Sequence, residues 1–535
     1  MKMASFNCNI DFGGVCKTQL IFCMVLYFVF IVLSNLYPSC PSSDFFPSFW
    51  KTAPDISISS RSVVSPTISN DSPTISAISN DSPTITNDPT ISNDSSTIST
   101  DSPTNLSHLV FGLVGSELAW HHRKAYIESW WRPNITRGFL FLDKEPTAEL
   151  LPWSRASPPY RISDDLTTFL KKPDLTAQRI VHGIVETFRE EHENLRWLVM
   201  GDDDSIFFLD NIVEILAKFD HTKYYYLGGH SEFIFSNYWF SFSQGFGGAG
   251  FMLSAPLAKA LAKDLENCLS RYAHLEAADQ STMSCIADIG VSLTPLQGIH
   301  QMDMRGDASG FLSSHPQFPL MSLHHFDMVE PIFPSMDRAK STRHLMKAAK
   351  FDQSRILQQT VCHHRKSNWT FSISWGYSVH LYERIMPRSY LQYPIETFEK
   401  WLPNPTPPHY MFNTRLPSND SCEAPHLFFF KSIKKTPKND VFTSFSRAWP
   451  RRLLPCSSNS AEIITKITVI SPETKRTEIS MFPVPFDPLN QIIYEYYYEN
   501  RANLIERCEC CDVIRVHGSK ADIKIRECMT DEIIA

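Results

Sequence analysis

Three consecutive aspartates, Asp202, Asp203 and Asp204, come directly after the apolar run WLVMG. Adjacent carboxylates repel one another and lose hydration where a chain leaves its core, so we expect a cation to offset their charge. A hard divalent ion with oxygen ligands, Mn²⁺ or Mg²⁺, is the simplest partner. An EF-hand is excluded, because Phe207 stands where its loop requires glycine and Val213 where it requires glutamate.

The alternative is an acidic helix start. Carboxylates near a helix N-terminus are favoured by its dipole, and Asp210 is placed to cap the helix that follows. Three aspartates at a strand exit exceed what capping needs, so we favour metal binding.

A glycine-rich stretch, SQGFGGAGFMLSAP, is the second unusual segment. Its Gly245, Gly247 and Gly250 formally match a dinucleotide-binding pattern. No clear strand precedes them and no helix opens after them, so we reject an NAD site. We expect these glycines to let the backbone approach a ligand or another strand closely, and Ser254 to cap the next helix.

The elements that must position these residues alternate between strand and helix from about residue 108 to 334. We predict strands at LVFGLVG, RGFLFLD and RWLVMG, and amphipathic helices at AQRIVHGIVETFREE and DNIVEILAKF. This alternation predicts an α/β sheet layered by helices. Ligands of such sheets bind beyond the carboxyl ends of the strands, which is where the aspartates fall.

Four segments in order, WLVMGDDDSIF, GFGGAGFMLS, AADQSTMSCIADIG and PLMSLHHFD, resemble the Fringe-related glycosyltransferases, most closely the plant branch with an extra C-terminal region. The likeness spans about residues 109–334, with the extra region included. It implies a GT-A-like mixed sheet flanked by helices. It also implies metal-dependent transfer, with inversion, of a sugar from a nucleotide-sugar (UDP-sugar) donor to a glycan or glycoprotein acceptor.

The resemblance also implies a metal site. Asp202 and Asp204 match its Asp-x-Asp positions, with Asp204 as the direct ligand of Mn²⁺ (or Mg²⁺) and Asp202 nearer the nucleotide. His324 matches the histidine that completes the site, and His325 is the alternative if the alignment slips by one residue.

Donor-binding residues follow from the same likeness. We expect Asp202 and Asp203 to contact the donor, together with Gly247, Gly248 and Ala249 of the glycine-rich segment.

An inverting transferase needs a group that takes the proton of the acceptor hydroxyl. Asp279 falls where the family has an acidic pair that includes this base, but the next residue here is Gln280. Asp279 has the alternative role of N-cap for the helix QSTMSCIADI. The base assignment therefore stays open.

The N-terminus predicts membrane attachment. Residues 20–37 are almost uncharged and long enough to span a bilayer, so we expect a signal anchor after a cytoplasmic tail of residues 1–19. Lys2 and Lys17 precede the anchor and Lys51 is the nearest cation beyond it, which favours a cytoplasmic N-terminus. A cleaved signal peptide is the alternative.

A low-complexity stalk rich in Ser, Thr and Pro is predicted for residues 38–107. Glycosylation sequons fit a luminal chain and a single-pass type II Golgi membrane protein. They begin at Asn70, Asn80, Asn93, Asn105, Asn134, Asn368 and Asn419. Among the cysteines we expect a Cys268–Cys285 disulfide, and a disulfide cluster rather than zinc at residues 508–511.

Residues 108–339 form the predicted transferase domain, and residues 340–535 a β-rich region of unknown role. In that region we predict one half-buried strand at WTFSISWGYSVHLY, and hairpins at ITKITVISPETKRTEISMF and VIRVHGSKADIKIREC.

Composition limits the function classes. With 43% hydrophobic residues and 12% aromatic residues the chain is not disordered overall, and a net charge of -7 without a basic stripe argues against nucleic acid. One competing function is a non-catalytic, membrane-tethered carbohydrate-binding protein that keeps the fold, and Gln280 supports it. A metal-dependent phosphoesterase is a second, less favoured alternative.

Overall fold

A mixed sheet carries the predicted strands in the computed structural model, which describes residues 102–473 and 509–532 except 192, 315, 317, 404, 405, 438, 459, 530 and 531. Strand β1 lies between two parallel neighbours, β2 and β4, and β7 runs antiparallel to β4. The predicted strands and the mixed α/β class are confirmed. The sheet order is β3 (Tyr160–Ile162), β2 (Arg137–Leu142), β1 (Leu109–Val114), β4 (Trp197–Asp202), β7 (Phe251–Ser254), β6 (Tyr226–Gly228) and β8 (Leu293–Pro295).

The predicted tail and anchor, and the stalk up to residue 101, lie outside the described residues. Within the described part of the chain, no helix is both long and apolar enough to cross a bilayer. All described residues belong to one compact unit.

Helices flank the sheet because each buries one apolar stripe. Val181 and Ile184 of α3 pack in one hydrophobic cluster with Leu257 and Leu261 of α6. Helices α2, α4 and α9 contribute to a second cluster. The helices are α2 (Glu117–Trp130), α3 (Thr176–Glu190), α4 (Leu209–Leu216), α5 (Ile234–Trp239), α6 (Ala255–Arg271), α7 (Ala278–Asp288), α8 (Ser309–Ser314), α9 (Arg338–Ala349) and α10 (Arg388–Leu391), with short 3-10 turns at Leu106–His108, Ala148–Leu150, Leu166–Thr168 and Ala461–Ile463.

The predicted helices α3 and α4 are confirmed, but neither Asp210, the alternative cap of α4, nor Ser254, the expected cap of α6, caps its helix. Asp210 lies in the first turn of α4, where its carboxylate binds both terminal nitrogens of Arg132 at 2.8 Å, and Phe208 occupies the N-cap position. Ser254 occupies the N-cap position of α6, but its hydroxyl accepts a hydrogen bond from the Tyr225 N–H at 2.9 Å instead of capping the helix.

Two small sheets extend from the main one. Strand β11 (Ser322–Leu323) pairs with β5 (Ile206–Phe207) on one side and β9 (Ile299–His300) on the other. Strand β10 (Met304–Gly306) pairs with β15 (Phe398–Lys400), so residues beyond 340 lie directly against the predicted transferase domain. The predicted boundary at residues 339 and 340 falls inside α9 and stays a prediction.

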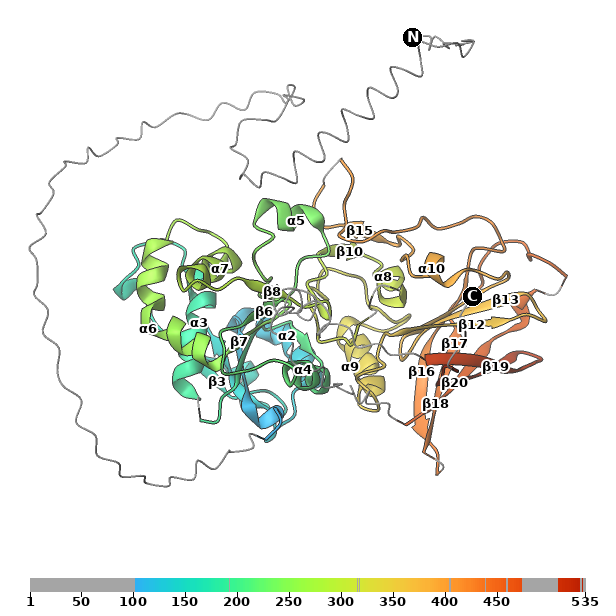
Figure 1. Cartoon of the computed structure of the whole chain (residues 1–535), viewed down its shortest axis with the longest axis horizontal. Coiled ribbons are helices and arrows are strands. Elements are labelled where there is room, and N and C mark those ends of the chain that lie inside the picture. Colours follow the sequence, from blue (N-terminus) through green and yellow to red (C-terminus); the bar gives the residue numbers. More distant parts are fainter. Residues whose placement is uncertain are drawn as a thin grey trace, which may run out of the picture. The chain divides into compact units, whose positions relative to one another are not determined.

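The β-rich C-terminal region is confirmed as an eight-stranded sheet. Its two edge strands, β12 and β19, are joined by the Cys362–Cys511 disulfide, which we call the seam. The order is β12 (Gln359–His364), β13 (Trp369–Ser374), β14 (Ser378–Tyr382), β16 (His426–Lys435), β17 (Asp440–Arg447), β18 (Lys466–Pro472), β20 (Lys520–Glu527) and β19 (Glu509–His517) (Figure 1).

The single half-buried strand predicted at WTFSISWGYSVHLY is wrong. It is a hairpin of β13 and β14, which reverses at Gly376, whose φ of 75° suits glycine. Both strands are buried on both faces, and the hydroxyls on the second face have hydrogen-bond partners. The Ser374 hydroxyl, for example, donates to the Leu312 carbonyl at 2.8 Å.

The hairpin predicted at VIRVHGSKADIKIREC is confirmed as β19 and β20. Only the first arm of the other predicted hairpin, β18, is described, and its neighbours are β17 and β20. The Cys268–Cys285 disulfide is confirmed. Cys510 and Cys511 also form disulfides, with Cys528 and Cys362, as the predicted cluster requires.

Candidate metal and transfer site

The turn between β4 and β5 holds the aspartate cluster. Asp203 and Asp204 are buried, with 2% and 0% of their surface exposed, and Asp202 is half-buried. Ser205 fixes the turn, because its Oγ accepts the Asp202 N–H at 2.7 Å and donates to the Gly248 carbonyl at 2.6 Å. The same contacts join the turn to the glycine-rich segment.

The small sheet of β5, β11 and β9 brings His324 to this turn. Leu323 of β11 pairs with Ile206 of β5, so the next residue, His324, lies beside Asp204. His324 Nε2 is 3.1 Å from Asp204 Oδ1 and 3.8 Å from Asp202 Oδ2. Ligand atoms of these three residues all lie within 4.8 Å of one another.

The alternative histidine, His325, points elsewhere. Its Nδ1 lies 3.0 Å from Asp303 Oδ1, and its ring stacks on Trp401 with 4.6 Å between the ring centroids. The structure therefore brings His324, and not His325, into the cluster with Asp202 and Asp204.

The residues present fit a divalent cation. Asp204 Oδ2 is buried and has no hydrogen-bond partner. A buried carboxylate oxygen without a donor carries a full desolvation penalty, which a bound cation would remove. Two carboxylates and one imidazole are a donor set that first-row divalent metals accept.

Arg123 of α2 balances part of the negative charge. Its Nη1 lies 2.6 Å from Asp203 Oδ1 and 3.3 Å from Asp204 Oδ1, and its Nε donates to Asp327 Oδ2 at 2.7 Å. The other oxygen of Asp203 accepts the Ser116 N–H at 3.2 Å. Asp203 thus has protein partners for both oxygens, and its expected contact with the donor stays a prediction.

The three aspartates differ in their affinity for protons. Burial raises the pKa of Asp202 well above its ordinary value, and the charges of Asp204 and Asp203 raise it further. Burial also raises the pKa of Asp203, against the opposing effect of Arg123. For Asp204 burial acts in the same direction, but the charge and hydrogen bond of His324 outweigh it and hold the pKa well below its ordinary value.

The glycine-rich segment leaves space for the site residues. A Cβ on Gly248 would lie 2.0 Å from His324 Cε1, and a Cβ on Gly247 would lie 2.7 Å from Asp279 Oδ1. The Ala249 N–H donates to Gln301 Oε1 at 2.9 Å, and the same oxygen lies 3.2 Å from His324 Nδ1. Gln301 Oε1 is therefore placed to accept a hydrogen bond from the Nδ1–H of His324, and Nε2 is the nitrogen that faces Asp204.

Asp279 lies at the other side of this segment. It is in the first turn of α7, where Ala277 occupies the N-cap position, so the cap-only role is wrong. Its Oδ1 instead accepts the Gly247 N–H at 2.9 Å, and burial raises its pKa to about 6. Gln280 points to a different partner, the Phe240 carbonyl, at 3.3 Å from its Nε2.

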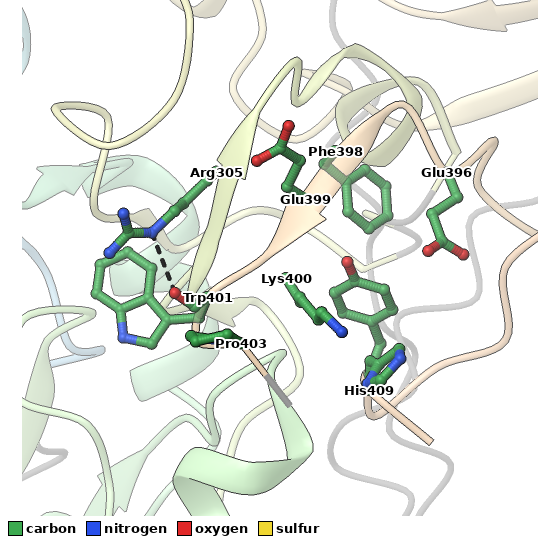
Figure 2. A pocket seen from close by; sticks show the side chains of 9 residues that line it. Arg305, Glu396, Phe398, Glu399, Lys400, Trp401, Pro403 and His409 are labelled. Carbon is green, nitrogen blue, oxygen red and sulfur yellow. Dashed lines mark hydrogen bonds between the residues drawn. The ribbon is translucent and has the colours of Figure 1, made fainter. Parts of the chain in front are cut away.

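A pocket of about 570 Å³ adjoins the site at Trp401. Figure 2 shows Arg305 over the Trp401 ring, with its Nε bonded to the Trp401 carbonyl at 3.0 Å. Aromatic, acidic and basic side chains surround the space. They are Arg305, Glu396, Phe398, Glu399, Lys400, Trp401, Pro403, His409 and Tyr410.

Residues 236–483 match a known family. It is described as "Protein of unknown function, DUF604". The match begins in α5, after the aspartate cluster, and includes the glycine-rich segment, Asp279 and His324. It continues without a break across residues 339 and 340 into the C-terminal sheet. None of the curated proteins matches the chain.

Sequence reasoning missed two residues of the site, Arg123 and Gln301, and also Trp401, which stacks on the neighbouring His325. Each comes from a segment with no distinctive motif, and each reaches its partner only through pairing or packing with residues distant in the sequence.

Proposed function

We propose that this protein is a metal-dependent glycosyltransferase. It moves a sugar from a nucleotide-sugar, of the UDP class, to a glycan or glycoprotein acceptor with inversion. One observation carries the proposal: ligand atoms of Asp202, Asp204 and His324 lie within 4.8 Å of one another, and one buried oxygen of Asp204 has no hydrogen-bond partner. Two further points support the same conclusion. Four segments resemble those of Fringe-related enzymes in the same order, and the mixed sheet is compatible with a GT-A-like fold.

Asp204 and His324 would hold Mn²⁺ (or Mg²⁺), with Asp202 nearest the nucleotide. When bound, the metal acts as a Lewis acid toward the departing diphosphate. The chain's own contribution is orientation, because Gln301 fixes the His324 ring and Ser205 fixes the turn that carries the aspartates. Arg123 limits the repulsion among the carboxylates.

Asp279 is the proposed general base. A carboxylate with a pKa of about 6 is ionised at neutral pH and is a stronger base than an exposed aspartate. The Gly247 N–H holds one oxygen of the carboxylate in place. The acceptor hydroxyl would then lose its proton to Asp279 as the new glycosidic bond forms.

The pocket beside Trp401 is the proposed acceptor site. Acidic and basic groups suit hydrogen bonds to sugar hydroxyls, and aromatic residues in the lining suit contact with the apolar faces of sugars. Several of its residues come from the C-terminal region, including Glu399, Lys400 and Trp401. This gives that region a role in acceptor recognition.

The alternative is a non-catalytic carbohydrate-binding protein with the same fold. Gln280, which replaces the second acidic residue and bonds to the Phe240 carbonyl, favours it. A donor screen decides between the two functions. The purified full chain is incubated with individual nucleotide-sugars and glycan acceptors, with and without Mn²⁺, and released nucleotide is measured. Mn²⁺-dependent release with one donor supports the enzyme, whereas donor or glycan binding without release supports the alternative.

We also propose that the chain is a single-pass type II Golgi membrane protein with a luminal transferase domain. All four sequons within the described residues, at Asn105, Asn134, Asn368 and Asn419, are exposed. An enzyme that removes N-glycans should therefore increase the mobility of the membrane-bound protein on a gel. An unchanged mobility, together with cleavage of the stalk by protease added from the cytosolic side, would contradict this topology.

A further inference from the structure

A second group of metal-ligating side chains lies apart from the aspartate cluster. Asp164, in the segment after β3, meets His182 and Glu186 of α3, and their ligand atoms all lie within 4.8 Å of one another. His182 and Glu186 are four residues apart, so they project from the same face of the helix. Helix α6 packs alongside α3 (Figure 1) and adds Glu266 near the imidazole.

The buried polar atoms of this group lack partners. His182 is 1% exposed, and neither of its ring nitrogens has a hydrogen-bond partner. Glu186 is 3% exposed, and its Oε2 also has none, whereas its Oε1 accepts the Asp164 N–H at 2.5 Å. Burying imidazole and carboxylate groups without hydrogen-bond partners costs folding free energy, unless a bound ligand supplies the missing interactions.

Charged groups from three elements face His182. Its Nδ1 lies 3.8 Å from Asp164 Oδ2 and 3.9 Å from Glu186 Oε1, and its Nε2 lies 3.6 Å from Glu266 Oε1. These separations are too long for hydrogen bonds. They exceed the spacing of ligands around a small cation by only a fraction of an ångström, since Zn²⁺ binds nitrogen and oxygen at about 2.0–2.2 Å.

We propose that Asp164, His182 and Glu186 form a binding site for a divalent transition metal of the Zn²⁺ type. Imidazole and carboxylate groups are established ligands for Zn²⁺, and water is available as the fourth ligand of an ion bound to Nδ1 of His182, the nitrogen that faces Asp164 and Glu186. The ion would join the segment after β3 to α3. It would therefore stabilise the domain whether or not the protein transfers sugars.

Glu186→Gln tests the site because the amide oxygen can still accept the Asp164 N–H, while the second carboxylate oxygen is lost. The full chain is stripped with a chelator, and Zn²⁺ alone is then titrated by calorimetry. We expect wild type to bind one more equivalent than Glu186→Gln, or to bind that equivalent at least about tenfold more tightly. Zn²⁺ should also raise the melting temperature of wild type more than that of the variant.

Glu190→Gln is the matched control, since Glu190 lies on the same helix and forms an exposed pair with Arg161. It should bind Zn²⁺ as wild type does. Asp164→Asn, a change of a carboxylate that is 44% exposed, serves as a second variant if Glu186→Gln does not fold. Equal stoichiometry, affinity and thermal shift in wild type and the folded variants would overturn the proposal.

Discussion

Asp204→Asn should abolish the Mn²⁺-dependent binding of a nucleotide-sugar while the protein stays folded. The amide is neutral and a much weaker ligand for a hard cation than the carboxylate. The change keeps the size and shape of the side chain. It weakens the attraction of Asp204 to His324, but it also relieves the repulsion that raises the pKa of Asp202, so we expect the fold to persist. Calorimetric titration of the nucleotide-sugar with and without Mn²⁺ measures the effect.

Asp210→Asn provides the control for this variant. It makes the same chemical change, but Asp210 lies on α4 and pairs with the exposed Arg132. Its affinity for the donor should equal that of wild type, and the melting temperatures of both variants should be close to that of wild type. Equal donor affinity for Asp204→Asn with Mn²⁺ present would remove Asp204 from the metal site.

Asp279→Asn should bind donor and metal about as well as wild type but lose roughly two to four powers of ten in transfer rate, which is the usual contribution of a general base. The side chain keeps an oxygen that can accept the Gly247 N–H, so its position should persist. Transfer is measured at saturating donor alongside the melting temperature.

The pH profile separates a base from a merely structural residue. Because burial raises the Asp279 pKa to about 6, transfer by wild type should fall as the pH drops through about 6, where the carboxylate becomes protonated. Asp279→Asn should lack this inflection. Asp288→Asn, at the other end of α7, should leave both rate and profile unchanged. A near-normal rate for Asp279→Asn would refute the base assignment.

The parts of the fold that could be predicted from the sequence are those with a local signal. Strands β1, β2 and β4 are mostly apolar runs, and α3 and α4 are amphipathic, so the hydrophobic pattern of the sequence alone identifies them. The aspartates were recognisable for a similar reason, because charge at the end of a buried strand is unusual. The choice of His324 over His325 rested on an ordered set of motifs, and the pairing of β5 with β11 gives its physical basis.

What could not be predicted depends on contacts between distant segments. Arg123 reaches Asp203 across 80 residues and Trp401 reaches His325 through the pairing of β10 with β15, and no local pattern indicates either contact. Trp375 and Tyr377 continue the alternation of apolar and polar residues through the turn, so the pattern predicts one strand where the structure has the β13–β14 hairpin. The turn at Gly376 divides this segment into two strands, and the covering of both faces, which is a tertiary property, makes these strands buried and not half-buried.

The seam, which is the disulfide between β12 and β19, can form only late in the synthesis of the chain. Its cysteines are 149 residues apart, so at roughly 5–20 residues per second a ribosome needs on the order of ten seconds to deliver Cys511 after Cys362. During that interval Cys362 lacks its disulfide partner, and the buried Arg355 lacks Glu509. The disulfide that joins the two edges of the C-terminal sheet can therefore form only after residue 511 has been synthesised, and its formation requires an oxidant.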